Sequence, residues 1–381
     1  MYQAFRFDKV DLPPGTEALR QEVRAFLADW APRWSPWDKG HSWSGFDRDF
    51  SRAVGARGWI GMAWPRDHGG AGRSMLERYV VIEEMLAAGA PVGAHWISDR
   101  QSGPLILRLG TEAQRSKYLP EIIRGEACFC IGLSEPDAGS DLAAVRSRAE
   151  PVTGGWRLNG RKIWTTNAHL SDYMIALVRT EGTVADRHKG LSQFIVRMDA
   201  PGVSIRQIAD MTGEAHFNEV TFDDVMLEPG ALIGAAGDGW EQVTAELAFE
   251  RSGPDRFLSS FPALAMLVEA SRDPDRLASR AIGQMVAELA VLRGMSLSVA
   301  GMLQDGLMPN TEAVVVKELG VELEQRTPEL VRAVAGGAGG AIEGGLSEIQ
   351  AALLQLTPTF SLRGGTREIV RGIIARGLGL R

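Results

Sequence analysis

Two short stretches of the sequence hold the side chains best suited to bind a flat heterocyclic cofactor. In residues 129–141, FCIGLSEPDAGSD, an apolar segment typical of a buried strand runs into a loop of turn-forming residues. In residues 159–167, NGRKIWTTN, an Asn-Gly turn pair leads to the broad ring of Trp164, with two Thr hydroxyls beside it. These residues alone leave two interpretations open: a site for a flat heterocycle, or two strands of one β-domain with a core Trp.

Glu250 is the candidate general base. Apolar residues at helical spacing mark one face of a helix that we expect to start near Asp238, and Glu250 lies at the edge of that face. A carboxylate that loses hydration beside apolar side chains becomes a stronger base at neutral pH. The alternative is a half-exposed Glu paired with Arg251 or Lys317, and the residues alone favour that alternative.

The surrounding periodicity predicts an α+β multi-domain protein with three regions. Residues 1–127 show helical spacing of apolar residues and predict an N-terminal α-helical domain. Residues 128–236 contain short strands separated by Gly, Pro and Asp turns, which predicts a small antiparallel β-barrel or sandwich. Residues 237–381 return to helical spacing and predict a C-terminal helical bundle. Within it we expect an inward-facing stripe formed by Leu277, Ala281, Met285, Leu289, Leu292, Ser296 and Val299.

Composition and charge argue against several classes of function. The chain has 381 residues, a formal net charge of −7 and no basic block, which disfavours nucleic acid as a partner. No apolar run is long enough to span a membrane and the N-terminus has no signal pattern, so we expect a cytoplasmic protein. The six histidines are scattered, and Cys128 and Cys130 share one predicted strand, so we expect neither a metal site nor a disulfide.

The two stretches, LSEPDAGSD followed by NGRKIWTTN, resemble the flavin-binding signature of the acyl-CoA dehydrogenase family. The resemblance covers nearly the whole chain, from the helical start to GGTREIVRGIIARGLG near the C-terminus, and it weakens between about residues 271 and 350. It implies the order helical domain, β-domain and four-helix bundle, with FAD as cofactor and an acyl-CoA as substrate. It also implies a tetramer and an electron-transfer flavoprotein as electron acceptor.

The resemblance assigns contacts to individual residues. Those expected to line the flavin or to hold the adenosine half of FAD are Ile131, Leu133, Ser134, Trp164, Thr165, Thr166, Thr366 and Glu368. Trp164 and Thr165 are expected to border the isoalloxazine ring, and Thr166 to bond near N5. Ser140 is expected to touch the pantetheine arm of CoA, and Arg251 to lie near the thioester. Core packing of Trp164 and a turn role for Ser140 are the structural alternatives.

Under the resemblance, Glu250 becomes the expected base. Many family members carry the catalytic Glu just before the Gly-Thr of the C-terminal motif, where this chain has Gly364. A smaller branch, resembling the isovaleryl and long-chain enzymes, carries it on a bundle helix directly before an Arg, as in Glu250-Arg251. Glu250 would then remove the α-proton while the β-hydrogen leaves as hydride to flavin N5, which gives a 2,3-enoyl-CoA.

One part of the family pattern is poorly matched. Family homotetramers complete each FAD site from a neighbouring subunit with two segments. One is an Arg, with a Phe or Gln and a Gly shortly after it, that grips the pyrophosphate, and residues 279–284 match it poorly. The other is a Gln followed by a Gly-Gly pair further on, which residues 322–335 lack. We therefore expect the catalytic subunit of a hetero-oligomer with a second acyl-CoA dehydrogenase-like subunit, resembling the heteromeric enzymes of steroid breakdown. The alternative is a homo-oligomer that uses Arg280 or Arg293 as a variant clamp.

The same resemblance leaves the acyl group and the oxidant open. Gly364 and Gly365 leave room for a branched or bulky acyl group, such as a steroid side chain. The competing functions are an oxygen-reactive acyl-CoA oxidase-like or flavin monooxygenase-like relative, and a non-catalytic subunit of a heteromeric complex. The complete flavin motifs and Glu250 argue against the non-catalytic subunit.

Overall fold

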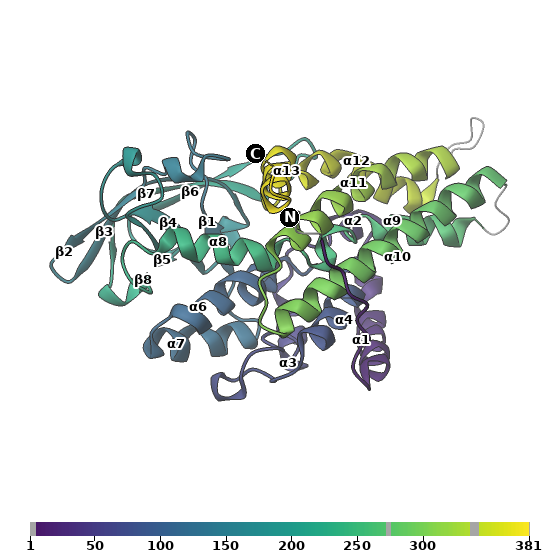
Figure 1. Cartoon of the computed structure of the whole chain (residues 1–381), viewed down its shortest axis with the longest axis horizontal. Coiled ribbons are helices and arrows are strands. Elements are labelled where there is room, and N and C mark those ends of the chain that lie inside the picture. The colour runs from purple at the N-terminus through teal and green to yellow at the C-terminus, as the bar shows by residue number, and fades with distance from the viewer. Residues whose placement is uncertain (1–4, 272–275, 336–342, 381) are drawn as a thin grey trace. The chain divides into compact units, whose positions relative to one another are not determined.

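The chain folds into two compact units (Figure 1). The computed structural model describes residues 5–271, 276–335 and 343–380, without the side chains of residues 246–250. The helical unit comprises Met1–Gly45, Arg73–Pro91 and Ala248–Arg381, and the β-containing unit comprises Phe46–Gly72 and Val92–Leu247. Both units take residues from the region 1–127, so the domain boundaries expected from the sequence stay a prediction.

An eight-stranded sheet forms the centre of the β-containing unit. Its strands are β1 (Phe129–Gly132), β2 (Arg148–Val152), β3 (Gly155–Thr166), β4 (Tyr173–Arg179), β5 (Leu191–Arg197), β6 (Val203–Ile208), β7 (Phe217–Leu227) and β8 (Leu232–Ile233). The path runs β6-β7-β3-β2-β4-β5-β8, and β1 pairs with β4 beside it. Most neighbours are antiparallel, as predicted, whereas β1 and one residue of β2 pair with β4 in parallel.

Apolar side chains cover both faces of this sheet. Met174, Phe194 and Phe222 belong to the core on one face. Leu177 packs with Val243 in a second cluster, which brings helix α8 onto the sheet. The helices of this unit are α3 (Arg48–Ala56), α5 (Gly93–Ile97), α6 (Gly103–Leu109), α7 (Glu112–Ile123) and most of α8 (Gly239–Glu250), with a π-helical turn at Ser98–Ser102.

The helical unit contains long helices at its C-terminal end and shorter ones from the start of the chain. Its helices are α1 (Thr16–Trp30), α2 (Pro36–His41), α4 (Met75–Ala87), α9 (Phe261–Ala270), α10 (Arg276–Gln304), α11 (Asn310–Ala335), α12 (Gly344–Phe360) and α13 (Arg367–Gly377). Ser74 and Glu77 form a reciprocal capping box at the start of α4, and their spacing is visible in the sequence. Helix α11 packs against α10, α12 and α13, and α4 packs against α1 and α10.

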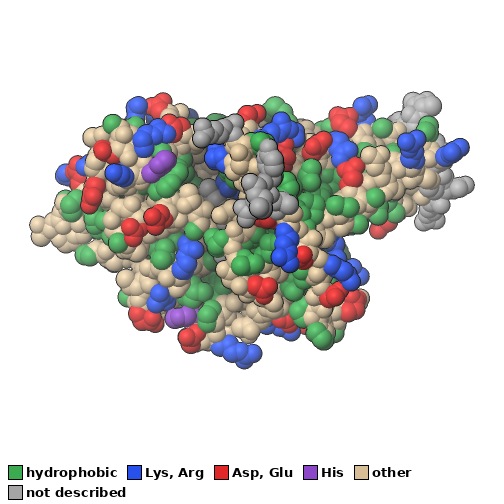
Figure 2. Space-filling model, in the orientation of Figure 1, with side chains coloured by type: hydrophobic (Ala, Val, Ile, Leu, Met, Phe, Trp, Pro, Cys, Tyr) green, Lys and Arg blue, Asp and Glu red, His purple; other side chains and the backbone are tan. Residues whose placement is uncertain are grey.

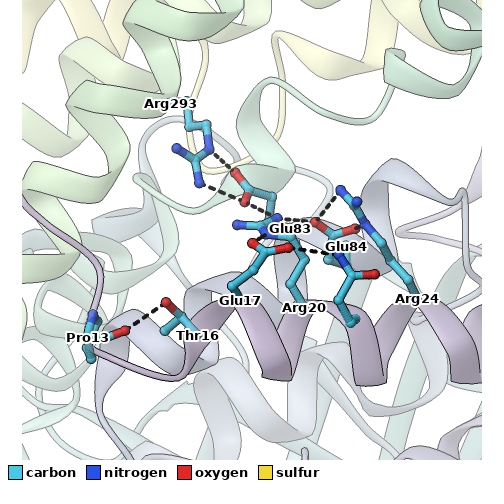
Figure 3. A network of polar contacts seen from close by, with 9 residues as sticks. Pro13, Thr16, Glu17, Arg20, Arg24, Glu83, Glu84 and Arg293 are labelled. Carbon is cyan, nitrogen blue, oxygen red and sulfur yellow. Dashed lines mark hydrogen bonds and ion pairs between the residues drawn. The ribbon is translucent and has the colours of Figure 1, made fainter.

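A cluster of ion pairs joins α1, α4 and α10 within the helical unit (Figure 3). The carboxylates of Glu83 and Glu84 are buried on α4. Arg24 Nε lies 2.7 Å from Glu84, Arg293 Nη2 lies 3.0 Å from Glu83, and Arg20 contacts both carboxylates. Because removing one partner would leave a buried charge uncompensated, this cluster fixes how the three helices pack.

Helix α10 differs in part from the expected inward stripe. Met285 and Leu292 are buried, but Leu277 is 77% exposed, so the prediction for Leu277 is wrong. Contrary to the expectation from the sequence, the helix is long and apolar enough to cross a membrane by length and composition, and 33% of its most apolar 18-residue stretch is buried. Its packing on α4 and α11 and the Arg293 ion pair favour a bundle helix. Figure 2 shows charges of both signs interspersed over the visible surface.

Candidate active site

Trp164 is held in an unusual backbone conformation that exposes its ring. Its φ angle is +60°, in the left-handed region that non-glycine residues rarely adopt. A register shift between Lys162 and Thr165 places it at an irregularity in the pairing of β3 with β7. The side chain is 57% exposed, and its ring meets Phe217 edge-on, with centroids 6.0 Å apart. The core-packing interpretation of Trp164 is therefore wrong.

The two threonines after Trp164 have different surroundings. Thr166 is half-buried, whereas Thr165 is only 1% exposed. The Thr165 hydroxyl has no hydrogen-bond partner among the described residues, and its carbonyl accepts from Asn218 Nδ2 at 2.9 Å. A buried hydroxyl without a partner costs free energy, so this atom is a candidate for a bond to a bound group. The exposed side chain here is therefore that of Trp164, whereas that of Thr165 is buried.

The loop after β1 is pinned to β3 beside Trp164. The backbone N–H of Ile163 donates to Ser134 O at 2.9 Å. Lys162 Nζ donates to Leu133 O at 3.1 Å and to Glu135 Oε1 at 2.7 Å. Ile131, Leu133 and Ser134 are half-buried. The β-containing unit thus brings the predicted flavin-lining residues of β1 and its loop next to those of β3.

The Glu135–Lys162 pair was not predicted. Lys162 is fully buried, and a Cβ atom on Gly132 would lie 3.2 Å from its Cγ, so glycine in β1 leaves room for the lysine stem. Glu135 also accepts from the backbone N–H groups of Arg146 and Ser147, at 2.7 and 2.9 Å. A Glu in the loop and a Lys in the strand were visible in the sequence, but their pairing depends on the tertiary fold.

Both members of this pair are charged at neutral pH. Burial lowers the pKa of Lys162 to about 8, although Glu135 opposes that shift. Burial by itself raises the pKa of Glu135, but the Lys162 charge and the hydrogen bonds to its carboxylate outweigh it, so the pKa of Glu135 lies below its ordinary value. A buried pair of this kind fixes geometry rather than supplying a base.

Ser140 lies exposed on the same loop, which a second set of contacts holds in place. The next residue, Asp141, accepts from both terminal nitrogens of Arg187, at 2.6 and 2.9 Å. The buried Arg179 side chain donates to Val145 O at 3.3 Å and to Lys189 O at 2.8 Å. The loop is therefore tied to the β4–β5 connection.

Arg251 is anchored within the helical unit, directly after the last residue of α8. Its Nε donates to Gly364 O at 3.0 Å, and Lys317 Nζ donates to Gly365 O. Gly364 and Gly365 have φ angles of +68° and +104°, which glycine adopts without strain. The Glu250 side chain lies outside the described residues, so its expected role and its alternative pairing with Arg251 or Lys317 both stay predictions.

Thr366 and Glu368 occupy the start of α13. Thr366 is the N-cap residue, and its hydroxyl accepts from Ile369 N at 3.5 Å. Glu368 is exposed, and a hydrogen bond from its own backbone N–H, followed by one from Thr366, lowers its pKa. Helix capping accounts for both side chains. These two residues and Arg251 lie in the helical unit, whereas the other predicted contacts lie in the β-containing unit.

The described residues offer no group of His, Cys, Asp and Glu that could hold a metal ion. Cys128 and Cys130 are buried free thiols. Burial raises the pKa of each thiol to about 12. Neither thiol is therefore a nucleophile at neutral pH.

Three family models together match most of the chain. They are described as the N-terminal, middle and C-terminal domains of acyl-CoA dehydrogenase, and they match residues 13–126, 130–225 and 273–379. The chain is 35% identical to acyl-CoA dehydrogenase IpdE1 of Mycobacterium tuberculosis, over 96% of this chain and 97% of that protein. It is 30% identical to acyl-CoA dehydrogenase FadE29 of the same organism, with the same coverage of each chain.

Solved structures of similar fold include heteromeric assemblies. The chain matches a structure titled Tcur3481-Tcur3483 steroid ACAD with a TM-score of 0.87 and 28% identity, covering 97% of this chain and 99% of that one. It matches the ChsE4-ChsE5 complex of Mycobacterium tuberculosis with a TM-score of 0.84 and 28% identity, covering 98% of this chain and all of that one.

Proposed function

Because the chain belongs to the acyl-CoA dehydrogenase family, whose members are FAD-dependent oxidoreductases, we propose that it converts an acyl-CoA to a 2,3-enoyl-CoA with Glu250 as the base. The observation that carries the proposal is the exposed Trp164 ring, held by a strained backbone beside the pinned loop after β1. Backbone strain of this kind persists where the surrounding structure enforces it, and functional sites are the usual place.

The residues of the β-containing unit fit a flavin. Trp164 offers an exposed aromatic face, and Thr165 offers a buried hydroxyl without a partner among the described residues. Ile131, Leu133 and Ser134 would line the ring from the β1 side, and Thr166 would bond near N5. Thr366 and Glu368 would meet the adenosine half. When bound, FAD supplies the acceptor for the β-hydrogen as hydride.

The contact between Arg251 and Gly364 supports Glu250 as the base. Glu250 ends α8, and the adjacent Arg251 is hydrogen-bonded to the backbone of Gly364. One hydrogen bond therefore joins Gly364, which stands at one of the family's two carboxylate positions, to the residue directly after Glu250, which stands at the other. Because Gly364 has no side chain, Glu250 is the carboxylate that remains to remove the α-proton. Its backbone N–H and the nearby Arg251 would stabilise the thioester oxygen.

Glu250→Gln is the direct test of the base. The variant should bind FAD normally, and flavin bleaching on mixing with substrate should be about 100- to 10,000-fold slower, since proton transfer by a positioned base contributes about 10²–10⁴-fold. Glu241→Gln, an exposed change on the same helix, should reduce its flavin at the normal rate. Normal flavin reduction by Glu250→Gln would reject Glu250 as the base.

We further propose a branched or bulky acyl group and a second acyl-CoA dehydrogenase-like subunit. The bare Gly364–Gly365 turn supports the first, and the poor match to the pyrophosphate clamp supports the second. A homo-oligomer with Arg280 or Arg293 as clamp is the alternative. Arg293 is already engaged with Glu83, which leaves Arg280 as the better of the two.

Expression of the chain alone decides between these assemblies. A colourless chain that gains stoichiometric FAD and activity only with a partner subunit supports the heteromer. A yellow, active homo-oligomer overturns it.

We also propose an electron-transfer flavoprotein as acceptor and a cytoplasmic location. Fast reoxidation of the reduced flavin by air would instead favour the oxidase-like function, and absence of reduction by any CoA ester would favour a non-catalytic subunit.

A further inference from the structure

A buried side-chain amide lies beside the irregular part of β3 that carries Trp164. It belongs to Asn218 of β7, which pairs with Thr165 of β3 and is fully buried. Regular pairing stops at Lys162 and resumes at Thr165, so two residues of β3, the second being Trp164, stand opposite one residue of β7. Asn218 is therefore the β7 residue opposite the point at which regular pairing resumes after the extra residue.

The Asn218 amide makes a hydrogen bond at each of three points around this irregularity. Its Nδ2 donates to Thr165 O at 2.9 Å and to His216 O at 3.1 Å, and its Oδ1 lies 2.9 Å from Nδ1 of His169 in the turn after β3. Carbonyl oxygens only accept hydrogen bonds, so these contacts fix which way the amide points, and His169 Nδ1 must carry the proton that it donates to Oδ1. A buried amide with both N–H groups and its oxygen engaged specifies one backbone geometry.

The two residues before Asn218 support the ring of Trp164. Phe217 meets that ring edge-on, with centroids 6.0 Å apart, and the ring of His216 packs on Phe217 with centroids 4.1 Å apart. The carbonyl of His216 also accepts from Asn167 N at 2.7 Å, which ties the end of β3 to the start of β7. The start of β7 therefore supports both the ring of Trp164 and the backbone that follows it.

We propose that Asn218 is the positioning residue of the flavin site, an inference that rests on the proposed function. A non-glycine residue stays in the left-handed region only where its surroundings hold it there. The Asn218 bond to Thr165 O acts directly after Trp164, so it sets the backbone direction that exposes the ring. Because Asn218 is fully buried, it acts on the flavin through Trp164 rather than by contact.

Asn218→Ala tests this role in two measurements. In the full-length protein freed of flavin, hydrogen exchange of residues 159–167 should become faster, because the backbone after Trp164 loses its anchor. FAD titration, with the partner subunit present if binding requires it, should show an affinity about tenfold weaker. Gln207→Ala, which removes an exposed amide from the neighbouring strand β6, should change neither measurement.

A double variant separates positioning from general stability. If Asn218 acts through Trp164, then Asn218→Ala in the Trp164→Gly background should alter FAD affinity less than about twofold, because residues that act through one another are not additive. His169→Leu removes only the bond to Asn218 Oδ1, so it serves if Asn218→Ala does not fold. It should weaken FAD about threefold. His169→Gln, whose amide can donate to the same oxygen, should recover most of the affinity.

Two results would overturn the positioning role. One is unchanged exchange of residues 159–167 in every variant that folds. The other is an equal loss of FAD affinity with and without the Trp164 ring, which means that Asn218 only stabilises the sheet. Failure of the proposed function looks different: residues 159–167 exchange faster in Asn218→Ala, but the unmodified protein binds no FAD in any assembly.

Discussion

Lys162 Nζ lies 2.7 Å from Glu135 Oε1, and both side chains are buried. This pair ties β3, which carries Trp164, to the loop after β1, which carries Ser134 and Ser140. The same lysine also bonds Leu133 O, so one side chain closes the loop at two points. The flavin-binding surface that we propose depends on this closure, because the loop and the strand contribute to it together.

Replacing Lys162 by Met should destabilise the protein strongly. The change keeps most of the side-chain volume but leaves Glu135 buried without its cation, which costs about 3–5 kcal/mol. Urea unfolding followed by circular dichroism would measure this loss in the free energy of unfolding. Arg161→Met, at the exposed neighbouring position, should change stability by less than ~0.5 kcal/mol. A loss below ~1 kcal/mol in Lys162→Met would mean that the pair contributes little beyond ordinary packing.

Acid should weaken the fold through Glu135. The pKa of Glu135 is lower in the folded protein than its ordinary value. At pH values above that ordinary pKa, this group therefore stabilises the folded state. The gain disappears as the pH falls through the folded pKa. Lys162 has a folded pKa of about 8 against 10.5 for a free lysine, so its own contribution to stability rises with pH across that interval.

Urea unfolding at a series of pH values checks both signs. Glu135→Gln should have a flatter acid limb than the unmodified protein, because the substituted side chain no longer takes up a proton on unfolding. Asp199→Asn is the exposed comparison: Arg197 also lowers the pKa of Asp199, but water screens that surface pair, so this variant should flatten the acid limb less than Glu135→Gln does. Equal acid slopes for Glu135→Gln and the unmodified protein would contradict the assignment.

Apolar periodicity predicted the helical and β-strand regions because it is a local signal. Helix α8 begins at Gly239, one residue from the predicted start. The left-handed backbone of Trp164 could not be predicted, because it arises from a register shift against β7, which is distant in sequence. Leu277 was misplaced for a related reason: periodicity marks a face of a helix but not how far along the helix that face is covered.

Trp164→Gly removes the aromatic ring and relieves the backbone strain, so it tests whether the ring itself holds the flavin. Glycine relieves the left-handed conformation, which costs non-glycine residues ~1 kcal/mol or more, so the variant should keep or gain stability. We expect its bound flavin per chain to fall, because the aromatic face is gone, and Trp164→Phe to retain most of the flavin. Met226→Ala removes another exposed apolar side chain from the same sheet and should leave flavin content unchanged. Full flavin occupancy in Trp164→Gly would show that the ring does not hold the cofactor.

Arg251→Leu should slow flavin reduction much more than it weakens substrate binding. The change removes the hydrogen bond to Gly364 O and so releases the end of α8 that carries Glu250. Misplacing a base by about 1 Å can cost ~100-fold in rate. We therefore expect slow flavin reduction in rapid mixing, with CoA binding reduced far less. Arg332→Leu, an exposed arginine on α11, should behave as the unmodified protein does. Because Lys317 still holds the Gly365 carbonyl in the variant, the fold should survive, and a large drop in melting temperature would mean that Arg251 acts on stability instead of position.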